Sequence, residues 1–96
     1  MNRIYISGKI GELPFPEVQQ KFSLASETIY QKGDIPISPL NNGLPTESEW
    51  HVHMLADLQM LTTCDEIALL PDWIASPGAM IEKAFAERMG LKVTYL

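Results

Sequence analysis

Apolar residues follow two spacings along this chain, and Pro and Gly residues separate the segments that show them. Three segments repeat apolar residues every three or four positions, which is the spacing of an amphipathic helix. Four short runs are instead β-branched, aromatic or continuously apolar, as strands are. The pattern predicts three helices, over residues 16–31, from a cap at Thr46 or Ser48 to about Leu61, and over 78–89. It predicts four strands, over residues 4–7, 34–38, 67–70 and 93–96.

Each predicted helix has an apolar stripe that we expect to be buried. In the first helix the stripe consists of Val18, Phe22, Ala25 and Ile29. In the second helix it consists of Trp50, Met54, Leu58 and Leu61. In the third helix one side carries Ile81, Ala84, Phe85 and Arg88. Glycine commonly follows the last turn of a helix, and we expect the first and third helices to end at Gly33 and Gly90.

The strands alternate with the helices, which is typical of a parallel sheet with right-handed crossovers. Pro36 has no amide hydrogen to donate, so the second strand should lie at an edge of the sheet. Residues 67–70 are continuously apolar, as expected of a central strand that is covered on both faces. We therefore expect residues 1–96 to form a single three-layer α/β domain, with a four-stranded parallel sheet in the order 2-1-3-4 and three helices.

In such a sheet a ligand binds where neighbouring connections diverge, at the carboxyl ends of the first and third strands. Two predicted loops meet there, at residues 8–16 and 71–78, and we expect the functional site in them. Ser76 can cap the third helix, and Gly78 allows another group to approach its free amides closely.

Composition limits the classes of partner. Hydrophobic residues make up 46% of the chain and charged residues 20%, as in an ordinary globular domain. The net charge of −5 argues against binding a nucleic-acid polymer but permits a single nucleotide. No apolar run reaches membrane-spanning length, and the lone Cys64 excludes an internal disulfide. We expect a cytoplasmic protein and, from its small core with apolar loop residues Trp73 and Ile74, a homodimer or larger homo-oligomer.

Three residues near the predicted crevice could carry chemistry. Glu82 lies about one turn into the third helix, where the helix N-terminus should keep its carboxylate ionised and suited to act as a nucleophile. Asp57 lies at the edge of the second helix's apolar stripe, and the hydroxyl of Tyr5 could orient a carboxylate at the end of the first strand. The alternatives are a solvated helix glutamate, a surface aspartate and a tyrosine at the edge of the core.

Other polar residues suggest less. His51 and His53 are two positions apart in a helix, so they point in nearly opposite directions and do not form a metal pair. Cys64 is expected to be a buried structural thiol. Trp73 either stacks on a ligand base or fills a subunit contact. Neither a metal nor a cofactor is expected.

Several motifs together carry a family resemblance. They are Ile4-Tyr5-Ile6-Ser7-Gly8, Asp57 eight residues before Asp65, Cys64-Asp65 before an apolar strand, the turn from Leu69 to Trp73, and the helix start from Ser76 to Glu82. With these motifs the chain resembles the nucleoside 2-deoxyribosyltransferase superfamily, and most of all a set of small bacterial and phage proteins placed beside it. The resemblance implies a Rossmann-like or flavodoxin-like fold and chemistry at an N-glycosidic bond.

The resemblance also implies roles for individual residues. Glu82 matches the nucleophile that attacks the sugar C1′, Asp57 the carboxylate that assists the leaving base, and Tyr5 the residue that orients the nucleophile. The remaining residues expected at the substrate are Gly8, Lys9, Asp72, Trp73, Ser76 and Gly78. The related nucleotide N-glycosidases have an Arg and a Ser in the first loop, so a 5′-phosphate would depend here on Lys9 or on backbone amides.

Three functions follow as hypotheses. The first is a nucleoside or nucleotide deoxyribosyltransferase or N-glycosidase that acts through Glu82 on a small-molecule substrate. The second is a non-catalytic nucleotide-binding module of the same fold. The third is a structural interaction protein, in which Trp73 and Met80 belong to a protein interface.

Overall fold

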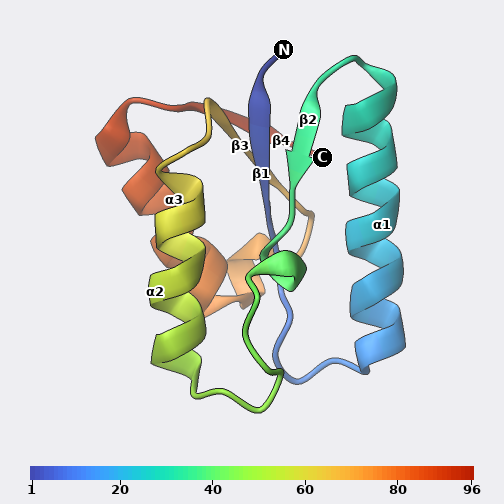
Figure 1. Cartoon of the computed structure of the whole chain (residues 1–96), viewed down its shortest axis with the longest axis vertical. Coiled ribbons are helices and arrows are strands. Elements are labelled where there is room, and N and C mark those ends of the chain that lie inside the picture. The colour runs from blue at the N-terminus through green and yellow to red at the C-terminus, as the bar shows by residue number, and fades with distance from the viewer.

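The four strands form one parallel sheet with helices on both of its faces, as Figure 1 shows. The structure is a computed structural model that describes residues 1–96. The strands are β1 (Arg3–Ser7), β2 (Ile35–Ile37), β3 (Glu66–Leu69) and β4 (Lys92–Tyr95). The helices are α1 (Phe15–Gln31), α2 (Trp50–Leu61) and α3 (Pro77–Met89), with the short 3-10 turns η1 (Pro39–Asn41) and η2 (Trp73–Ala75). None of these helices has the length and hydropathy that a membrane crossing needs.

The order β2-β1-β3-β4 confirms the predicted sheet and the three-layer α/β fold. Pro36 lies in the edge strand β2, where its missing amide hydrogen removes no bond from the interior of the sheet. All four residues of β3 are buried, as predicted for a central strand with helices over both faces.

Side chains of β1 alternate between the two faces of the sheet, and this alternation separates the core into two clusters. Ile4 and Ile6 pack under α1, which lies alone on one face (Figure 1). The buried residues of α1 that meet them are the four predicted ones, Val18, Phe22, Ala25 and Ile29.

The opposite face lies under α2 and α3, and Tyr5 points toward it from β1. Its apolar cluster also contains Leu61 of α2, Ala86 of α3 and Cys64. Cys64 is buried as predicted, and burial raises the pKa of its thiol.

The predicted faces of α2 and α3 are partly wrong. In α3 the buried residues are Ala79, Glu82 and Ala86, whereas Ile81 and Ala84 of the predicted apolar side are exposed. In α2 the buried residues are Met54, Asp57 and Leu61, and the side chain of Trp50 is 58% exposed. Met54 and Leu61 of the predicted α2 stripe are buried, and Phe85 of α3 packs against the second cluster. The predictions differ from the structure because each helix also buries a carboxyl residue, Asp57 or Glu82.

The start of α2 also differs from the prediction. Neither Thr46 nor Ser48 caps α2, which begins at Trp50 after Glu49 without a side-chain cap. Ser76 does cap α3, since its Oγ accepts a hydrogen bond from the Ala79 amide at 3.1 Å. Gly90 ends α3 with a φ of +81°, in the left-handed region that glycine adopts without strain.

Candidate active site

A cavity of about 600 Å³ opens at the carboxyl end of the sheet. Its walls come from the loop after β1, the segment between β2 and α2, the first half of α2 and the start of α3. The loops that follow β1 and β2 come together at the lower end of the view in Figure 1. Both Glu82 and Asp57 line this cavity, so the structure brings together the two carboxyl groups that the sequence singled out.

Two hydroxyl groups on β1 donate hydrogen bonds to the carboxyl group of Glu82. Tyr5 Oη donates a hydrogen bond to Glu82 Oε2 at 2.6 Å, and Ser7 Oγ donates one to Glu82 Oε1 at 2.6 Å. Residues two apart on a strand point to the same face, which explains why both hydroxyls reach one carboxyl group. The Glu82 side chain is only 5% exposed, and its orientation is therefore fixed at both oxygen atoms.

Burial raises the pKa of Glu82 to about 7, which corrects the expectation that the helix N-terminus keeps it ionised. Removal from water disfavours the charged form, and the nearby Asp57 acts in the same direction. The hydrogen bonds from Ser7 and Tyr5 stabilise the ionised form and oppose that rise. The interpretation of Glu82 as a solvated glutamate is wrong, because the group is buried.

The pKa of the Tyr5 hydroxyl is also shifted by burial and by the neighbouring carboxyl groups. Burial and the neighbouring charges of Glu82 and Asp57 raise the pKa of its hydroxyl, which keeps the proton on Tyr5. Tyr5 therefore acts toward Glu82 as a hydrogen-bond donor, which is the orienting geometry that the family resemblance implies.

Asp57 is buried on α2, and its interpretation as a surface aspartate is wrong as well. Asn42 Nδ2 donates a hydrogen bond to Asp57 Oδ1 at 2.9 Å. Burial raises the pKa of Asp57, while the hydrogen bond from Asn42 and the proximity of His53 oppose the rise. A protonated Asp57 can donate to a ligand in the cavity.

Asn42, His53 and Ser7 are site residues that the sequence reasoning missed. Asn42 Nδ2 also contacts His53 Nδ1 at 2.9 Å, and His53 lines the cavity while His51 is exposed. Ser7 could have been found, because it is the last residue of β1 and alternates in phase with Tyr5. Asn42 carries no such signal, since it lies in an irregular segment rich in Pro, Asn and Gly.

The residues expected at the substrate divide into two groups. Gly8, Lys9, Ser76 and Gly78 line the cavity with Glu82, whereas Asp72 and Trp73 do not.

Asp72 is instead a structural acceptor. Its Oδ1 accepts a hydrogen bond from the Lys9 amide at 3.0 Å, and its other oxygen forms an ion pair with Lys21 of α1. Burial opposes ionisation of Asp72, but the hydrogen bonds from Lys21 and Lys9 outweigh it and lower its pKa. Asp72 thus holds the loop after β1 in place and does not line the cavity.

Trp73 packs away from the cavity, against the second core cluster. Its ring centroid lies 6.2 Å from that of Tyr95, and Lys83 Nζ lies 5.2 Å from the centre of its ring. In this position Trp73 does not line the cavity beside Glu82.

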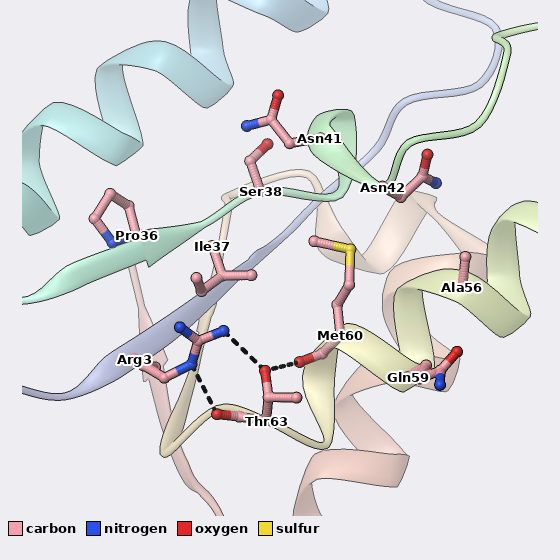
Figure 2. Close-up of a pocket in the computed structure, with 10 residues that line it drawn as sticks. All are labelled: Arg3, Pro36, Ile37, Ser38, Asn41, Asn42, Ala56, Gln59, Met60 and Thr63. Atoms are coloured by element: carbon pink, nitrogen blue, oxygen red, sulfur yellow. Dashed lines mark hydrogen bonds between the residues drawn. The ribbon is translucent and has the colours of Figure 1, made fainter.

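A second cavity of about 500 Å³ lies between the edge strand β2 and α2 (Figure 2). Arg3 is the charged residue in its wall, and its guanidinium donates to the Thr63 carbonyl and to Thr63 Oγ1, each at 2.9 Å. Asn42 lines both cavities. The second cavity contains no carboxyl group, so we place the candidate active site in the first one.

The arrangement around the first cavity suits acid–base and nucleophilic chemistry. Two buried carboxyl groups line the cavity, which is large enough for a small molecule. No group of three or more His, Cys, Asp or Glu side chains in the chain could hold a metal ion.

Sequence comparison gives a family that accounts for almost the whole chain. The family described as "Domain of unknown function (DUF4406)" matches residues 2–95. The chain belongs to this family. No curated protein matches the sequence.

Among solved structures, the chain is similar to a 2-desoxiribosyltransferase from Leishmania mexicana. The two share 18% sequence identity with a TM-score of 0.75, and the match covers 100% of this chain and 64% of the other. The chain therefore spans about two thirds of the length of that enzyme. At this identity the comparison shows a common fold.

Proposed function

We propose that this chain is a nucleoside or nucleotide 2-deoxyribosyltransferase, or an N-glycosidase, that uses Glu82 as its nucleophile. The observation that carries the proposal is the Glu82 carboxyl, which is buried at the cavity wall and held by Tyr5 and Ser7 at 2.6 Å each. A single fixed carboxyl beside a second one, Asp57, is what displacement at a sugar carbon requires. The fold that the chain shares with a 2-desoxiribosyltransferase supports the same assignment.

In the first step, an oxygen of ionised Glu82 attacks C1′ of the deoxyribose and forms an ester bond to the sugar. The bond from C1′ to the base breaks, and its electron pair leaves with the base. Protonated Asp57 gives its proton to the base, which departs neutral. The hydrogen bonds from Tyr5 and Ser7 keep the attacking carboxylate oriented.

In the second step, water or another base attacks C1′, and the ester bond to Glu82 breaks. The carboxylate of Asp57 takes the proton that the attacking molecule loses, so both carboxyl groups return to their starting states. Water gives hydrolysis and a free sugar, whereas a second base gives transfer. Lys9, which lines the cavity, is the cation available for a 5′-phosphate.

The proposal is tested with Glu82→Gln, which keeps the shape of the side chain and removes the nucleophile. We expect base release from a panel of deoxynucleosides and their monophosphates to fall by on the order of a thousandfold or more. Glu87→Gln is the matched control, because Glu87 lies on the exposed side of the same helix. Equal rates in Glu82→Gln and the parent would contradict the proposal.

A non-catalytic nucleotide-binding module is the second candidate, and the raised pKa of Glu82 favours it. A carboxyl with a pKa of about 7 is about half protonated at neutral pH, and a protonated carboxyl donates a hydrogen bond and does not attack. This function predicts saturable binding of a nucleotide by calorimetry, without base release from any substrate in the panel. It also predicts that Glu82→Gln still binds.

A further inference from the structure

Three contacts fix the orientation of the Asn42 side-chain amide. Its Oδ1 accepts a hydrogen bond from the Leu44 amide at 3.0 Å, so the other end of the side chain is the nitrogen. The two hydrogens of Nδ2 then go to Asp57 Oδ1 and to His53 Nδ1, each at 2.9 Å. The amide cannot be turned over without losing these contacts.

The orientation of Asn42 in turn fixes the histidine. Because Nδ1 of His53 receives a hydrogen from Asn42, it acts as an acceptor and carries no proton. The ring proton of the neutral side chain is therefore on Nε2. His53 lines the cavity and has no part in the bond-breaking steps proposed above, so this donor is free for a ligand.

A second donor lies beside it. Asp57 is four residues after His53 on α2, so the two side chains share one face of the helix, a turn apart. Its Oδ1 is occupied by Asn42, which leaves Oδ2 for the ligand. Burial favours the protonated acid, and the proton that Asp57 passes to the leaving base is then on Oδ2.

We propose that His53 and Asp57 together bind the N7 and O6 edge of a purine, and that the site selects 6-oxopurines such as hypoxanthine and guanine over adenine. Asp57 Oδ2 donates to N7, and His53 Nε2 donates to O6. The inference rests on the proposed function, because that function places the base beside Asp57.

The selection follows from the donors and acceptors on the two kinds of purine. A 6-oxopurine presents two acceptors on this edge, N7 and O6, whereas adenine presents the acceptor N7 and an amino donor. Against adenine, the Nε2 proton of His53 would face an N–H group and remain unpaired. Asn42 prevents His53 from moving its proton to Nδ1, so the site cannot adapt to the amino group.

Calorimetry with free bases tests the selection on the parent protein without any turnover. We expect hypoxanthine to bind at least about tenfold more tightly than adenine. Unsubstituted purine, which has no group at position 6, should fall between them. Equal affinities for hypoxanthine and adenine, or no binding of either base, would overturn the inference.

Two variants assign the selection to these residues. In His53→Leu the donor is lost, and the ratio of the two affinities should fall to within about twofold. In Asn42→Ala the histidine is free to adopt either tautomer, and the ratio should fall as well. Because the readout is a ratio, a general loss of stability would not change it.

His51→Leu is the matched control for His53→Leu, since His51 is exposed on the same helix and does not line the cavity. It should keep the parental ratio, and the same ratio in His53→Leu as in the parent would overturn the inference. The two proposals fail separately. Base release that is independent of Glu82 contradicts the enzymatic function, whereas equal binding of the two bases contradicts the selection.

Discussion

The two faces of the sheet use the same strands in different ways. Every buried residue of α1 is apolar, whereas α2 and α3 each bury one carboxyl group, Asp57 and Glu82. Within β1, Ile4 and Ile6 belong to the first face, and Tyr5 and Ser7 reach Glu82 on the second. Both faces bury apolar residues, but only the second also places buried carboxyl groups at a cavity, at the expense of stability.

The physical reason lies in what burial does to each kind of group. Removing apolar area from water stabilises the folded chain in proportion to that area. Removing a carboxyl group from water destabilises its charged form unless hydrogen bonds replace the lost hydration. The raised pKa of Glu82 shows that the bonds from Tyr5 and Ser7 replace only part of it.

Truncation of the first face should have the largest effect on stability. Phe22 of α1 is 1% exposed and packs against Ile4 and Ile6, so Phe22→Ala leaves a cavity. We expect the free energy of unfolding to fall by about 3–5 kcal/mol, measured by urea denaturation. A loss below about 1 kcal/mol would mean that the first face does not stabilise the fold as the comparison requires. Leu24→Ala, at an exposed position of the same helix, is the control.

The buried carboxyl groups of the second face should make the free energy of unfolding depend on pH. The folded protein holds the Glu82 proton up to about pH 7, whereas the unfolded chain releases it near pH 4.5. Between these values the folded state binds more protons, so its free energy of unfolding falls as the pH rises. The expected loss is up to roughly 3 kcal/mol, and Asp57, whose pKa is also raised, acts in the same direction.

Glu82→Gln should remove the Glu82 part of this dependence, because glutamine does not ionise. The difference in unfolding free energy between the variant and the parent should grow in favour of the variant from about pH 4.5 to pH 7. Urea denaturation at several pH values measures it. If the unfolding free energies of the two proteins changed with pH in parallel, burial of Glu82 would not be the cause of the difference between the two faces.

The smallest expected effect lies where the two faces meet, at the end of β1. A Cβ atom added at Gly8 would lie 2.8 Å from Leu70 Cβ and 2.6 Å from its Cδ1, so Gly8→Ala must displace a residue of the first cluster. We expect a loss of about 1–3 kcal/mol in unfolding free energy. Gly11→Ala is the matched control, since nothing lies within 4 Å of its added Cβ. Equal stability of the two variants would contradict this contact.

Much of the fold could be predicted because it depends on local patterns. The stripe of α1, Pro36 at the edge, the buried run of β3 and the stop at Gly90 all follow from the preferences of neighbouring residues. The buried faces of α2 and α3 could be predicted only in part. Met54 and Leu61 follow from their spacing, but Asp57 and Glu82 are buried because of partners elsewhere in the chain. Self-association and a cytoplasmic location stay predictions.

The site could be predicted only in part. The motifs indicate Glu82, Asp57 and Tyr5, but each residue taken alone also fits an ordinary structural position. Asp72 and Trp73 lie in the turn after β3 with no sequence signal that separates them from site residues, and neither lines the cavity. The spacing of His51 and His53 excludes a metal pair, and nothing in the sequence indicates that His53 contacts Asn42, eleven residues away in an irregular segment.

The amino-acid sequence by itself determined the order of elements, the parallel sheet and the end of the sheet at which a site would form, because side-chain spacing and turn residues act over a few positions. Tertiary structure decided which polar groups are buried together. The contacts between Glu82 and the hydroxyls of Tyr5 and Ser7 span 77 and 75 residues of chain. The charge state of such a carboxyl depends on the water that distant segments exclude and on the donors they bring, and no local pattern records either.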